Sequence, residues 1–581
     1  MTRNAEVAAL LDEMADHLEA RDVDYKPNSY RRAADSVRGH TISVEMLREE
    51  GGQDAIKGID DVGDAIASKI VEYLDTGSIG ELEALREELP VEMDALTAVE
   101  GVGPKSVAKL HDALGIETLD ELEAAAEAGS IREVPGFGPK TEQNILEKIP
   151  FARQSRQRAL LGEARPAADR VVAFFEAVDT VERVEVTGSI RRWRPTIGDV
   201  DVLVASADAE SVVAAFEGWD EVDEVIEAGT SKASVRSNGL RIDLRVVVDD
   251  EFGAALQYFT GSKEHNIAVR NRAIERGLKL NEYGLFDVSD VTNPDDGQRV
   301  GELVVADSEA GIYEALDMSW IPPELRENRG EVDAAVEGTL PELIELDEIR
   351  GDLHVHTTWS DGADDIEAMV EAAADVGYDY LAIADHATGP GMVGGVGLDD
   401  DALGEQLEAI RSIDDEAPID VFAGVEANIG ANGEISVGDG VLAELDCVVA
   451  SPHSGLDGDG TDRIVAAIEH PAVDVVGHPT GRLLNQRPGH DLDVERVAAA
   501  AAAHDTALEV NADPHRLDLD GGAVQLAVEA GAPISINTDA HRTDAFEYAR
   551  YGVHTARRGW AEADDVINCL DGSGMRAFLG L

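Results

Sequence analysis

The sequence predicts a multidomain α/β protein, with helical domains at the N-terminus, a mixed α/β region and a C-terminal α/β barrel. Residues 1–80 show short amphipathic helical patterns, with apolar residues at i, i+3 and i+4. Residues 151–320 alternate helical and strand-like segments. From about residue 347, apolar strand-like runs alternate with helical stretches to the end, a rhythm typical of an α/β barrel or sheet. A length of 581 residues allows about three to five domains.

Charge is the most unusual feature of the composition. Asp and Glu number 118 against 48 Lys and Arg, which gives a net charge of −70. Alone, this balance argues against nucleic-acid binding, which favours a basic footprint, and self-repulsion should destabilise the chain in dilute buffer. Both objections weaken in molar salt, where the Debye length is about 3 Å. We therefore expect a halophilic host with a high-salt cytoplasm.

The sequence predicts a cytoplasmic, nucleoid-associated monomer without a membrane segment. No stretch approaches ~18 consecutive apolar residues, and the acid-containing residues 1–20 do not resemble a signal peptide. The only cysteines, Cys447 and Cys569, are far apart, which excludes a disulfide framework and a thiolate zinc site.

Three glycine-centred turns lie between helical patterns, at residues 58–66, 99–110 and 134–145. The last two share Gly-x-Gly-Pro-Lys, in which proline begins a helix whose N-terminus can bind a phosphate through backbone N–H groups. One copy could equally be a plain helix connection, but two in tandem favour DNA binding. The first turn departs from the pattern at Asp60 and Asp61. The predicted DNA-binding residues are Gly101, Gly103, Lys105, Gly136, Gly138 and Lys140.

The segment TGSIRRWRPTIGDVDVLV (187–204) carries a second motif. Arg191, Arg192 and Arg194 can complement phosphate charge after a small-residue turn. Asp199 and Asp201 then enter an apolar strand, where residues i and i+2 point to the same face.

A third carboxylate, Asp243, lies in the alternating strand LRIDLRVVV (240–248). Three converging carboxylates can hold two hard cations, Mg²⁺ or Mn²⁺, for in-line phosphoryl transfer. A lone Asp-x-Asp would indicate only an exposed strand edge; the added turn and the third Asp favour a metal site.

On these residues, the first 320 positions resemble the family X DNA polymerases. The resemblance implies a DNA polymerase in repair, acting on gapped or primer–template DNA with dNTPs. It implies catalytic, metal-binding roles for Asp199, Asp201 and Asp243. Ile197 replaces a serine that the family often has there. Triphosphate contacts are implied at Gly188, Ser189, Arg192 and Gly198.

YFTGSKEHNIAVR (258–270) matches the same family's nucleotide-binding turn and following helix. By this resemblance Tyr258 and Phe259 lie against the sugar and help exclude ribonucleotides, and Gly261 belongs to the turn. Asn266 faces the incoming base, and Arg270 contacts the templating strand.

The N-terminal 80 residues resemble the family's lyase domain, through NSYRRAADSVR (28–38) and residues 60–77. Lys69 matches the Schiff-base position, but Ala65 replaces a neighbouring basic residue. A lysine becomes nucleophilic when burial or a nearby cation lowers its pKa. An ordinary helix-surface lysine is therefore the favoured interpretation, with lyase activity as the alternative.

In the second half, seven apolar runs each end in potential metal ligands. Chemistry gathers at the C-terminal ends of parallel barrel strands, so these groups are expected to ring one mouth. Mixed imidazole and carboxylate suit zinc, manganese or iron. Six of the fifteen histidines fall at strand ends. The groups are His354, His356, His386, Glu426, His453, His478, Glu509, Asn511, Asp539 and His541.

Residues 347–581 resemble the PHP phosphoesterases, whose fold is a distorted seven-stranded barrel. The resemblance implies two or three ions, Mn²⁺ or Zn²⁺, and a 3′–5′ exonuclease or abasic-site endonuclease activity. Asp385 is expected to support a ligand histidine. The implied ligands are His354, His356, Asp361, His386, Glu426, His453, His478, Asp539 and His541.

These patterns predict five segments: a lyase-like domain (1–80), tandem helix-hairpin-helix turns (81–150), a nucleotidyltransferase palm with nucleotide selection (151–320), a linker (321–346) and the PHP barrel (347–581). Three alternatives remain: a barrel that cleaves a metabolite phosphate held by Arg482, Arg487 or Arg516, a DNA-binding scaffold, and a nucleotidyltransferase with other acceptors.

The net charge of −70 generates a prediction about folding. The chain should be folded and active at about 2 M KCl and should lose structure at about 0.1 M, because screening removes its self-repulsion. Circular dichroism across a KCl series measures this. A chain that is better folded at the lower concentration would contradict the expectation.

Overall fold

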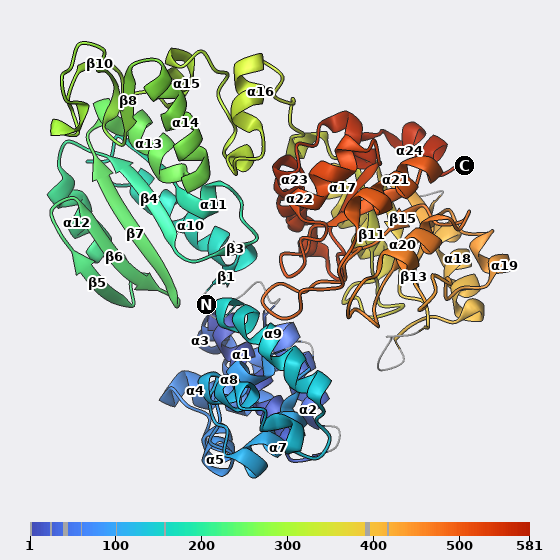
Figure 1. Cartoon of the computed structure of the whole chain (residues 1–581). Helices are drawn as coiled ribbons and strands as arrows, with labels where there is room; N and C mark the ends of the chain where they lie inside the picture. Colours follow the sequence, from blue (N-terminus) through green and yellow to red (C-terminus); the bar gives the residue numbers. More distant parts are fainter. Residues whose placement is uncertain are drawn as a thin grey trace. The chain divides into compact units, whose positions relative to one another are not determined.

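The computed structural model describes residues 3–23, 26–38, 44–59, 61–99, 101–155, 158–389, 396–414 and 417–581 (Figure 1). Two compact units follow from the contacts: residues 1–159, 213–243 and 485–487 form one, and residues 160–212, 244–484 and 488–581 form the other. No helix among the described residues has both the length and the apolar character needed to cross a membrane.

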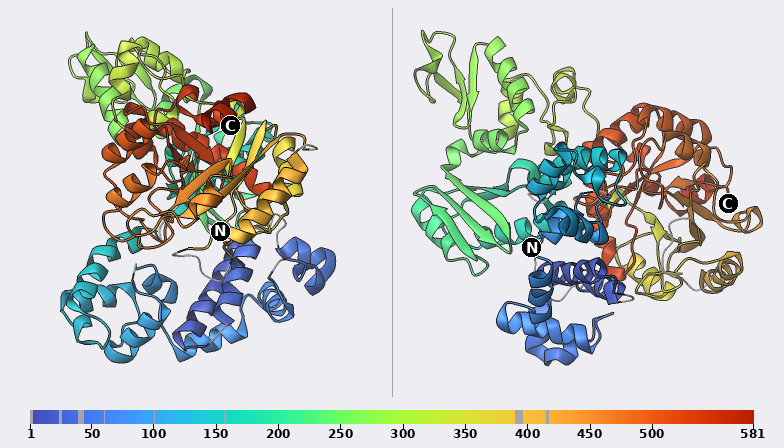
Figure 2. Two further views of the ribbon diagram at one scale, coloured as in Figure 1. Left: turned by 90° about the vertical axis from the view of Figure 1, so that its right-hand side faces the viewer. Right: turned by 60° about the horizontal axis from the view of Figure 1, so that its bottom comes forward.

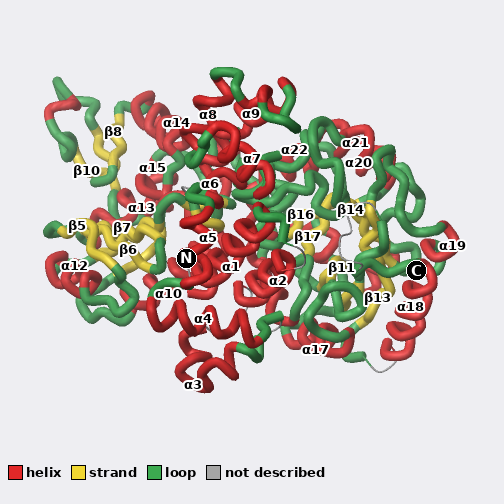
Figure 3. The backbone as a smooth tube through the Cα atoms, turned by 90° about the horizontal axis from the view of Figure 1, so that it is seen from below, coloured by secondary structure: helices red, strands yellow, loops and turns green. Residues whose placement is uncertain are grey.

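Residues 3–155, where described, are helices joined by loops (Figure 3). They enclose two separate apolar cores, one around Leu11 and Ile70 and the other around Leu110 and Leu122, which are at most 1% exposed. The helices are α1 (Arg3–Ala20), α2 (Lys26–Arg38), α3 (Val44–Ile56), α4 (Asp64–Thr76), α5 (Gly80–Glu88), α6 (Met93–Thr97), α7 (Pro104–Leu114), α8 (Leu119–Glu127) and α9 (Pro139–Ser155).

The central region contains a five-stranded sheet in the order β2-β4-β7-β6-β5. In β7, Ile242, Leu244 and Val246 are buried on one face, whereas Asp243 is half-buried on the other, as the alternating sequence predicts. The strands are β2 (Arg183–Val186), β4 (Val200–Ala205), β5 (Glu224–Ala228), β6 (Lys232–Ser237) and β7 (Leu240–Val247), with a two-stranded pair, β1 (Ala159–Leu160) and β3 (Thr196–Ile197).

Helices and a smaller antiparallel sheet, β10-β9-β8, complete this region. The strands are β8 (Leu278–Asn281), β9 (Gly284–Asp287) and β10 (Glu302–Val305). The helices are α10 (Leu161–Glu176), α11 (Gly188–Arg191), α12 (Ala209–Glu217), α13 (Phe252–Thr260), α14 (Lys263–Glu275) and α15 (Glu309–Ala315).

Residues 321–346 differ from the expected linker because they pack tightly. The segment includes the short helix α16 (Glu331–Glu337), and Ile321, Leu325 and Arg326 are fully buried. The Arg326 guanidinium lies 2.6 Å from the Glu309 carboxylate. Acid-rich composition predicts a linker poorly here, since acids are abundant along the whole chain.

The C-terminal region is a barrel of seven parallel strands in sequence order, β11 to β17, as predicted (Figures 1 and 2). A parallel bridge between Val355 and Ala540, with the His356 N–H donating to the Ala540 carbonyl at 2.8 Å, brings the first and last strands together. The strands are β11 (Gly351–Val355), β12 (Tyr380–Ile383), β13 (Asp420–Asn428), β14 (Cys447–Ser451), β15 (Val475–Val476), β16 (Ala507–Asn511) and β17 (Ile534–Asn537).

Barrel strands are buried on both faces. Leu353, Ala382 and Phe422 belong to one apolar cluster, whereas Val355 and Ile383 belong to another, so successive residues serve different cores. The strands therefore read as continuous apolar runs. The helices are α17 (Ile366–Asp375), α18 (Asp400–Asp414), α19 (Asp439–Leu442), α20 (Thr461–Ile468), α21 (Val494–His504), α22 (Gly521–Glu529), α23 (Ala549–Arg558) and α24 (Gly572–Phe578).

Candidate metal centres and nucleic-acid interface

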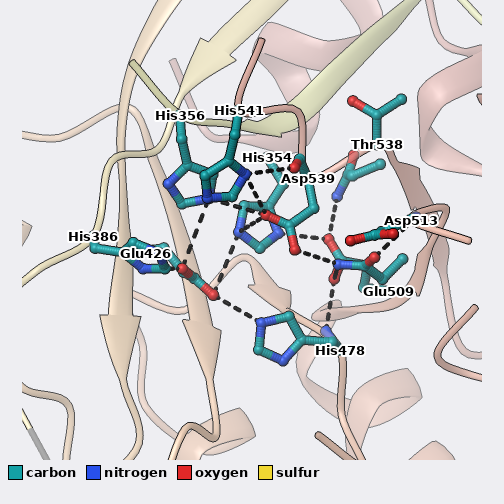
Figure 4. A network of polar contacts seen from close by, with 12 residues as sticks. His354, His356, His386, Glu426, His478, Glu509, Asp513, Thr538, Asp539 and His541 are labelled. Atoms are coloured by element: carbon teal, nitrogen blue, oxygen red, sulfur yellow. Dashed lines mark hydrogen bonds and ion pairs between the residues drawn. The ribbon is translucent and has the colours of Figure 1, made fainter. Parts of the chain in front are cut away.

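The polar groups at the barrel strand ends converge on one centre (Figure 4). His354 and His356 come from β11 and the residue after it, and Glu426 lies within β13. His386 and His541 follow β12 and β17. All these elements end at the same mouth, because the strands are parallel.

The carboxylate of Glu426, which is fully buried, is the common neighbour of five imidazoles. Its oxygens lie 2.5 Å from His386 Nδ1, 3.0 Å from His478 Nε2 and 3.2 Å from His453 Nε2. His354 Nε2 and His356 Nε2 lie 3.4 and 3.8 Å away.

Three overlapping groups of side chains in the barrel each offer ligand atoms within 4.8 Å of one another. His478 and Asp539 contact these groups through Glu426 and His356, at 3.0 and 3.1 Å. All nine predicted ligands are thus brought together. The groups are His356, Asp361, His386 and His541; His354, His356 and Glu426; and His386, Glu426 and His453.

Unsatisfied buried atoms show that this donor set fits metal ions. Buried polar atoms are usually hydrogen-bonded, and exceptions need a physical explanation. Within the described part of the chain, both ring nitrogens of His356 are buried without a hydrogen-bond partner, and so are His354 Nε2, His386 Nδ1, His453 Nε2, His478 Nδ1 and Glu426 Oε2. Several lone-pair donors aimed at one centre are the arrangement that cations stabilise.

Burial and charge act on these imidazoles in opposite directions. Burial lowers the pKa of His356 and of His478 to about 4, which keeps both rings neutral. Burial also disfavours a charge on His386, but the Glu426 and Asp361 carboxylates outweigh it and raise the pKa of His386 to about 10. Neutral imidazole is the ligand form, so His386 would have to lose its proton to hold a metal ion.

Residues outside the predicted set orient the ligands. The Glu509 carboxylate lies 2.8 Å from His354 Nδ1 and accepts the His478 backbone N–H at 2.6 Å. The Asn428 side-chain oxygen lies 2.8 Å from His453 Nδ1. Such partners fix ring orientation. The sequence marked Glu509 as a candidate ligand, because it lies at the end of an apolar run. Its supporting role could not be predicted, because that role depends on tertiary contacts.

Asp385 contacts no histidine among its described hydrogen bonds, which corrects the expected support of a ligand histidine. It accepts hydrogen bonds from the Thr357 backbone at 2.8 Å, the Thr357 hydroxyl at 2.6 Å and the Gln406 amide at 2.5 Å. It also accepts from the Ser360 hydroxyl. Asp385 therefore holds the loop that precedes Asp361.

A second, smaller group lies on the five-stranded sheet. Asp199, Asp201 and Asp243 are half-buried, and their ligand oxygens lie within 4.8 Å of one another. Gly188 has a φ of +63°, and a Cβ there would meet the Asp201 carboxylate oxygen at 2.3 Å. Only glycine therefore lets the small-residue turn approach these carboxylates.

Arginines near this turn differ in their partners. Arg191 pairs with the buried Glu309 at 2.7 Å, so it serves the fold rather than a free phosphate site. Arg192 donates to the Thr260 carbonyl and pairs with Glu327 at 3.1 Å. Arg194 remains 44% exposed.

The predicted nucleotide-selection residues lie at the end of α13 and in α14. The rings of Tyr258 and Phe259 meet edge-on at 5.2 Å, and Asn266 donates to the Tyr258 carbonyl at 2.7 Å. Gly261 has a φ of +68°, and a Cβ there would lie 3.1 Å from the Arg192 guanidinium. Arg270 is exposed.

Both Gly-x-Gly-Pro-Lys turns lead into helices, as predicted. Gly103 caps α7 with Pro104 in its first turn, and the second turn precedes α9. Gly101 and Gly136 have φ values of +85° and +98°. Lys105 pairs with Asp22 at 2.7 Å. Lys140 is exposed and Gly138 lies just before α9. Asp60, in the first turn, lies outside the described residues.

The Lys69 side chain is half-buried, at 15% exposed, and it is paired rather than free. Its amine lies 3.0 Å from the Glu81 carboxylate and 6.0 Å from the centre of the Tyr30 ring. Burial opposes the charge, but the hydrogen bond to Glu81 outweighs it and raises the pKa of Lys69. A protonated amine is a poor nucleophile.

Comparison with known proteins agrees with this geometry. The family models that match are a "Helix-hairpin-helix domain" at residues 2–79, a "SAM-like Helix-hairpin-helix tandem" at 93–149, a "DNA polymerase beta thumb" at 255–327 and a "PHP domain" at 352–468.

The "DNA polymerase/3′-5′ exonuclease PolX" of Bacillus subtilis (strain 168) is 33% identical over 582 residues, which cover 99% of each chain. The chain belongs to the PolX family. "DNA polymerase lambda" of Rattus norvegicus and of Arabidopsis thaliana are 23% and 24% identical over 56% of the chain, and over 56% and 62% of their own lengths. The match to PolX spans both metal-ligand groups, whereas the other two match little more than half of the chain.

The ion pair of Lys69 generates a prediction for this PolX-family chain. Borohydride should trap no adduct with a 5′-deoxyribose-phosphate DNA end at neutral pH, because Glu81 keeps the amine protonated. Glu81→Gln should raise trapping if Lys69 reaches the end. The control is Lys57→Ala, which removes an exposed lysine. A wild-type adduct that disappears only in Lys69→Ala would contradict the prediction.

Proposed function

We propose that this chain is a template-directed DNA polymerase that fills short gaps during DNA repair, such as base excision repair. We propose further that its PHP barrel is a 3′–5′ exonuclease and abasic-site endonuclease. The observation that carries the proposal is the presence of two complete, chemically different ligand groups in a chain that matches PolX along its whole length.

In the polymerase, Asp199, Asp201 and Asp243 would hold Mg²⁺ or Mn²⁺, which stabilise the attacking and leaving oxygens of a phosphoryl transfer. Gly188 and Ser189 would receive the triphosphate where the backbone turn allows close approach. Arg192 and Gly198 would complete that contact. The Arg192 guanidinium would then exchange its contact with Glu327 for a phosphate oxygen.

Nucleotide selection is proposed for the pair Tyr258 and Phe259. Their edge-on packing fixes both rings, which would leave little room for a ribose 2′-hydroxyl. Asn266 holds the Tyr258 carbonyl and would face the incoming base, and Arg270, being exposed, would contact the templating strand.

The barrel residues would hold two or three ions, Mn²⁺ or Zn²⁺, which supply a nucleophile at neutral pH and offset phosphoryl charge when bound. Glu426 would be a ligand among them, because its two oxygens already face different histidine sets. Glu509 and Asn428 would keep His354 and His453 in the orientation that presents their free nitrogens.

DNA binding by so acidic a chain needs contacts that do not depend on net charge. Turns capped by Gly103 and Gly138 present backbone N–H groups to phosphates. Such donors keep their dipoles in high salt, where counterion release weakens. We propose a cytoplasmic setting of high salt and a nucleoid location on this basis, together with a monomeric state and the domain boundaries predicted above, except for the linker at 321–346, which is packed.

The metabolite alternative is weaker for a physical reason. Arg482 donates to the carbonyls of Arg516 and Leu517 and is therefore committed to the fold. Arg516 lies 3.5 Å from the Asp539 carboxylate, inside the ligand group. An arginine there can orient a phosphodiester as readily as a metabolite phosphate.

Asp201→Ala tests the polymerase assignment. Gapped-duplex extension with dNTPs and Mn²⁺ should fall at least about a hundredfold, because a lost metal ligand removes several kcal/mol of transition-state stabilisation. Trimming of 3′ ends should persist. The matched control is Asp290→Ala, which removes an exposed carboxylate. Extension at the wild-type rate would contradict the assignment of these carboxylates to the polymerase.

Replacing His354 and His356 together with Ala tests the nuclease. A labelled single strand should no longer be shortened, because one of the three groups loses one ligand and a second loses two. Extension should persist. The control is His504→Ala, an exposed histidine at the end of α21. Wild-type shortening in the double variant would place the nuclease elsewhere and favour the metabolite alternative.

A further inference from the structure

A cavity of about 320 Å³ lies beside the loop that follows the triphosphate turn, where barrel helices α22 and α23 border it. It is separate from both metal-ligand groups. Its charged lining is unusual for a chain of net charge −70, because basic groups outnumber acidic ones. These groups are Arg194, Arg329, Arg482, Arg558, Glu327 and Asp520.

The carboxylates of this cavity do not neutralise its arginines. Asp520 faces Arg482 at 3.4 Å. The Glu327 carboxylate lies 3.1 Å from the Arg558 guanidinium and 3.4 Å from that of Arg194. It also lies 3.1 Å from the Arg192 guanidinium, outside the cavity. One negative charge is therefore shared among three guanidinium groups.

The Arg329 guanidinium adds a further positive charge and has no carboxylate as a hydrogen-bond partner among the described residues, although the Arg329 backbone N–H donates to Glu331 at 2.7 Å. It donates to the Gly521 carbonyl at 3.0 Å and to the Arg558 carbonyl. Its Nε is buried and has no hydrogen-bond partner among the residues that the structure describes. Burial lowers the pKa of Arg329, and burial lowers that of Arg558 to about 10. A buried cation is costly unless it is fully paired with a counter-charge.

We propose that this cavity binds a phosphoanion. Guanidinium forks match the oxygen spacing of phosphate and form short charge-assisted hydrogen bonds with it. A phosphoanion would supply the missing negative charge. The volume admits a multi-atom anion, since one water takes up roughly 30 Å³. The phosphoanion is either pyrophosphate, the product of nucleotide addition, or a terminal phosphate of DNA.

Calorimetric titration of the full chain with inorganic pyrophosphate tests the proposal. One class of binding site should weaken at least about tenfold in Arg194→Gln and in Arg329→Gln. The matched control is Arg496→Gln, which removes an exposed barrel arginine paired with Asp462, and it should bind as the wild type does. Arg194→Gln alters a side chain that is 44% exposed, so it keeps the test valid if Arg329→Gln unfolds.

Ser189→Ala separates this cavity from the triphosphate turn. Binding that is lost in Ser189→Ala but kept in Arg194→Gln and Arg329→Gln would overturn the proposal, and so would the absence of saturable binding in the wild type. Competition with matched oligonucleotides then identifies the source. Displacement by a 5′-phosphorylated strand but not by its 5′-hydroxyl counterpart assigns a DNA end. Displacement by neither strand assigns pyrophosphate.

Discussion

The ligand centre of the barrel depends on the contacts of one side chain. The Glu426 carboxylate is fully buried and lies next to five imidazoles. A buried carboxylate needs counter-charges, and neutral imidazoles supply none. Protons or metal ions must therefore accompany it. Among the described residues, the ring nitrogens of His356 have no hydrogen-bond partner, so hydrogen bonds within the protein do not satisfy every polar atom of this centre. Metal ions at this centre would satisfy Glu426 and the histidines together.

Much of the surrounding structure keeps this centre in place. The bridge between Val355 and Ala540 closes the strand ring, and Glu509 fixes His354. Asp385 holds the loop that carries Asp361. The polymerase group needs less support, because Asp199, Asp201 and Asp243 are oxygen ligands on regular strands. One chain thus carries an all-carboxylate group suited to hard cations and a mixed group suited to transition metals.

Local patterns in the sequence predicted those features of the fold and the sites that depend on the periodicity of strands and helices. The strand alternation around Asp243 and the ligands at the ends of apolar runs required only the repeat of a strand and the polarity of parallel sheets. The linker over 321–346 was expected from acid content, which carries little information in so acidic a chain. Its burial comes from tertiary contacts, which include the Arg326–Glu309 pair and the apolar core around Ile321 and Leu325.

Other features also lay beyond sequence patterns. The partner of Lys69 is Glu81 on the next helix, and the contacts of Asp385 come from Thr357 and Gln406. The sequence separation between these partners follows no fixed rule, so a sequence pattern cannot predict them. The charge imbalance around Arg329 likewise appears only when distant segments meet. Function was therefore more readily predicted than the interactions that support it.

Metal analysis of the intact protein tests the central role of Glu426 most directly. After dialysis against Mn²⁺, inductively coupled plasma mass spectrometry should find more than one ion per wild-type chain. Glu426→Gln should lose most of the barrel metal, with 3′ trimming lost and gap extension retained. Unchanged metal content together with wild-type trimming in Glu426→Gln would contradict the account.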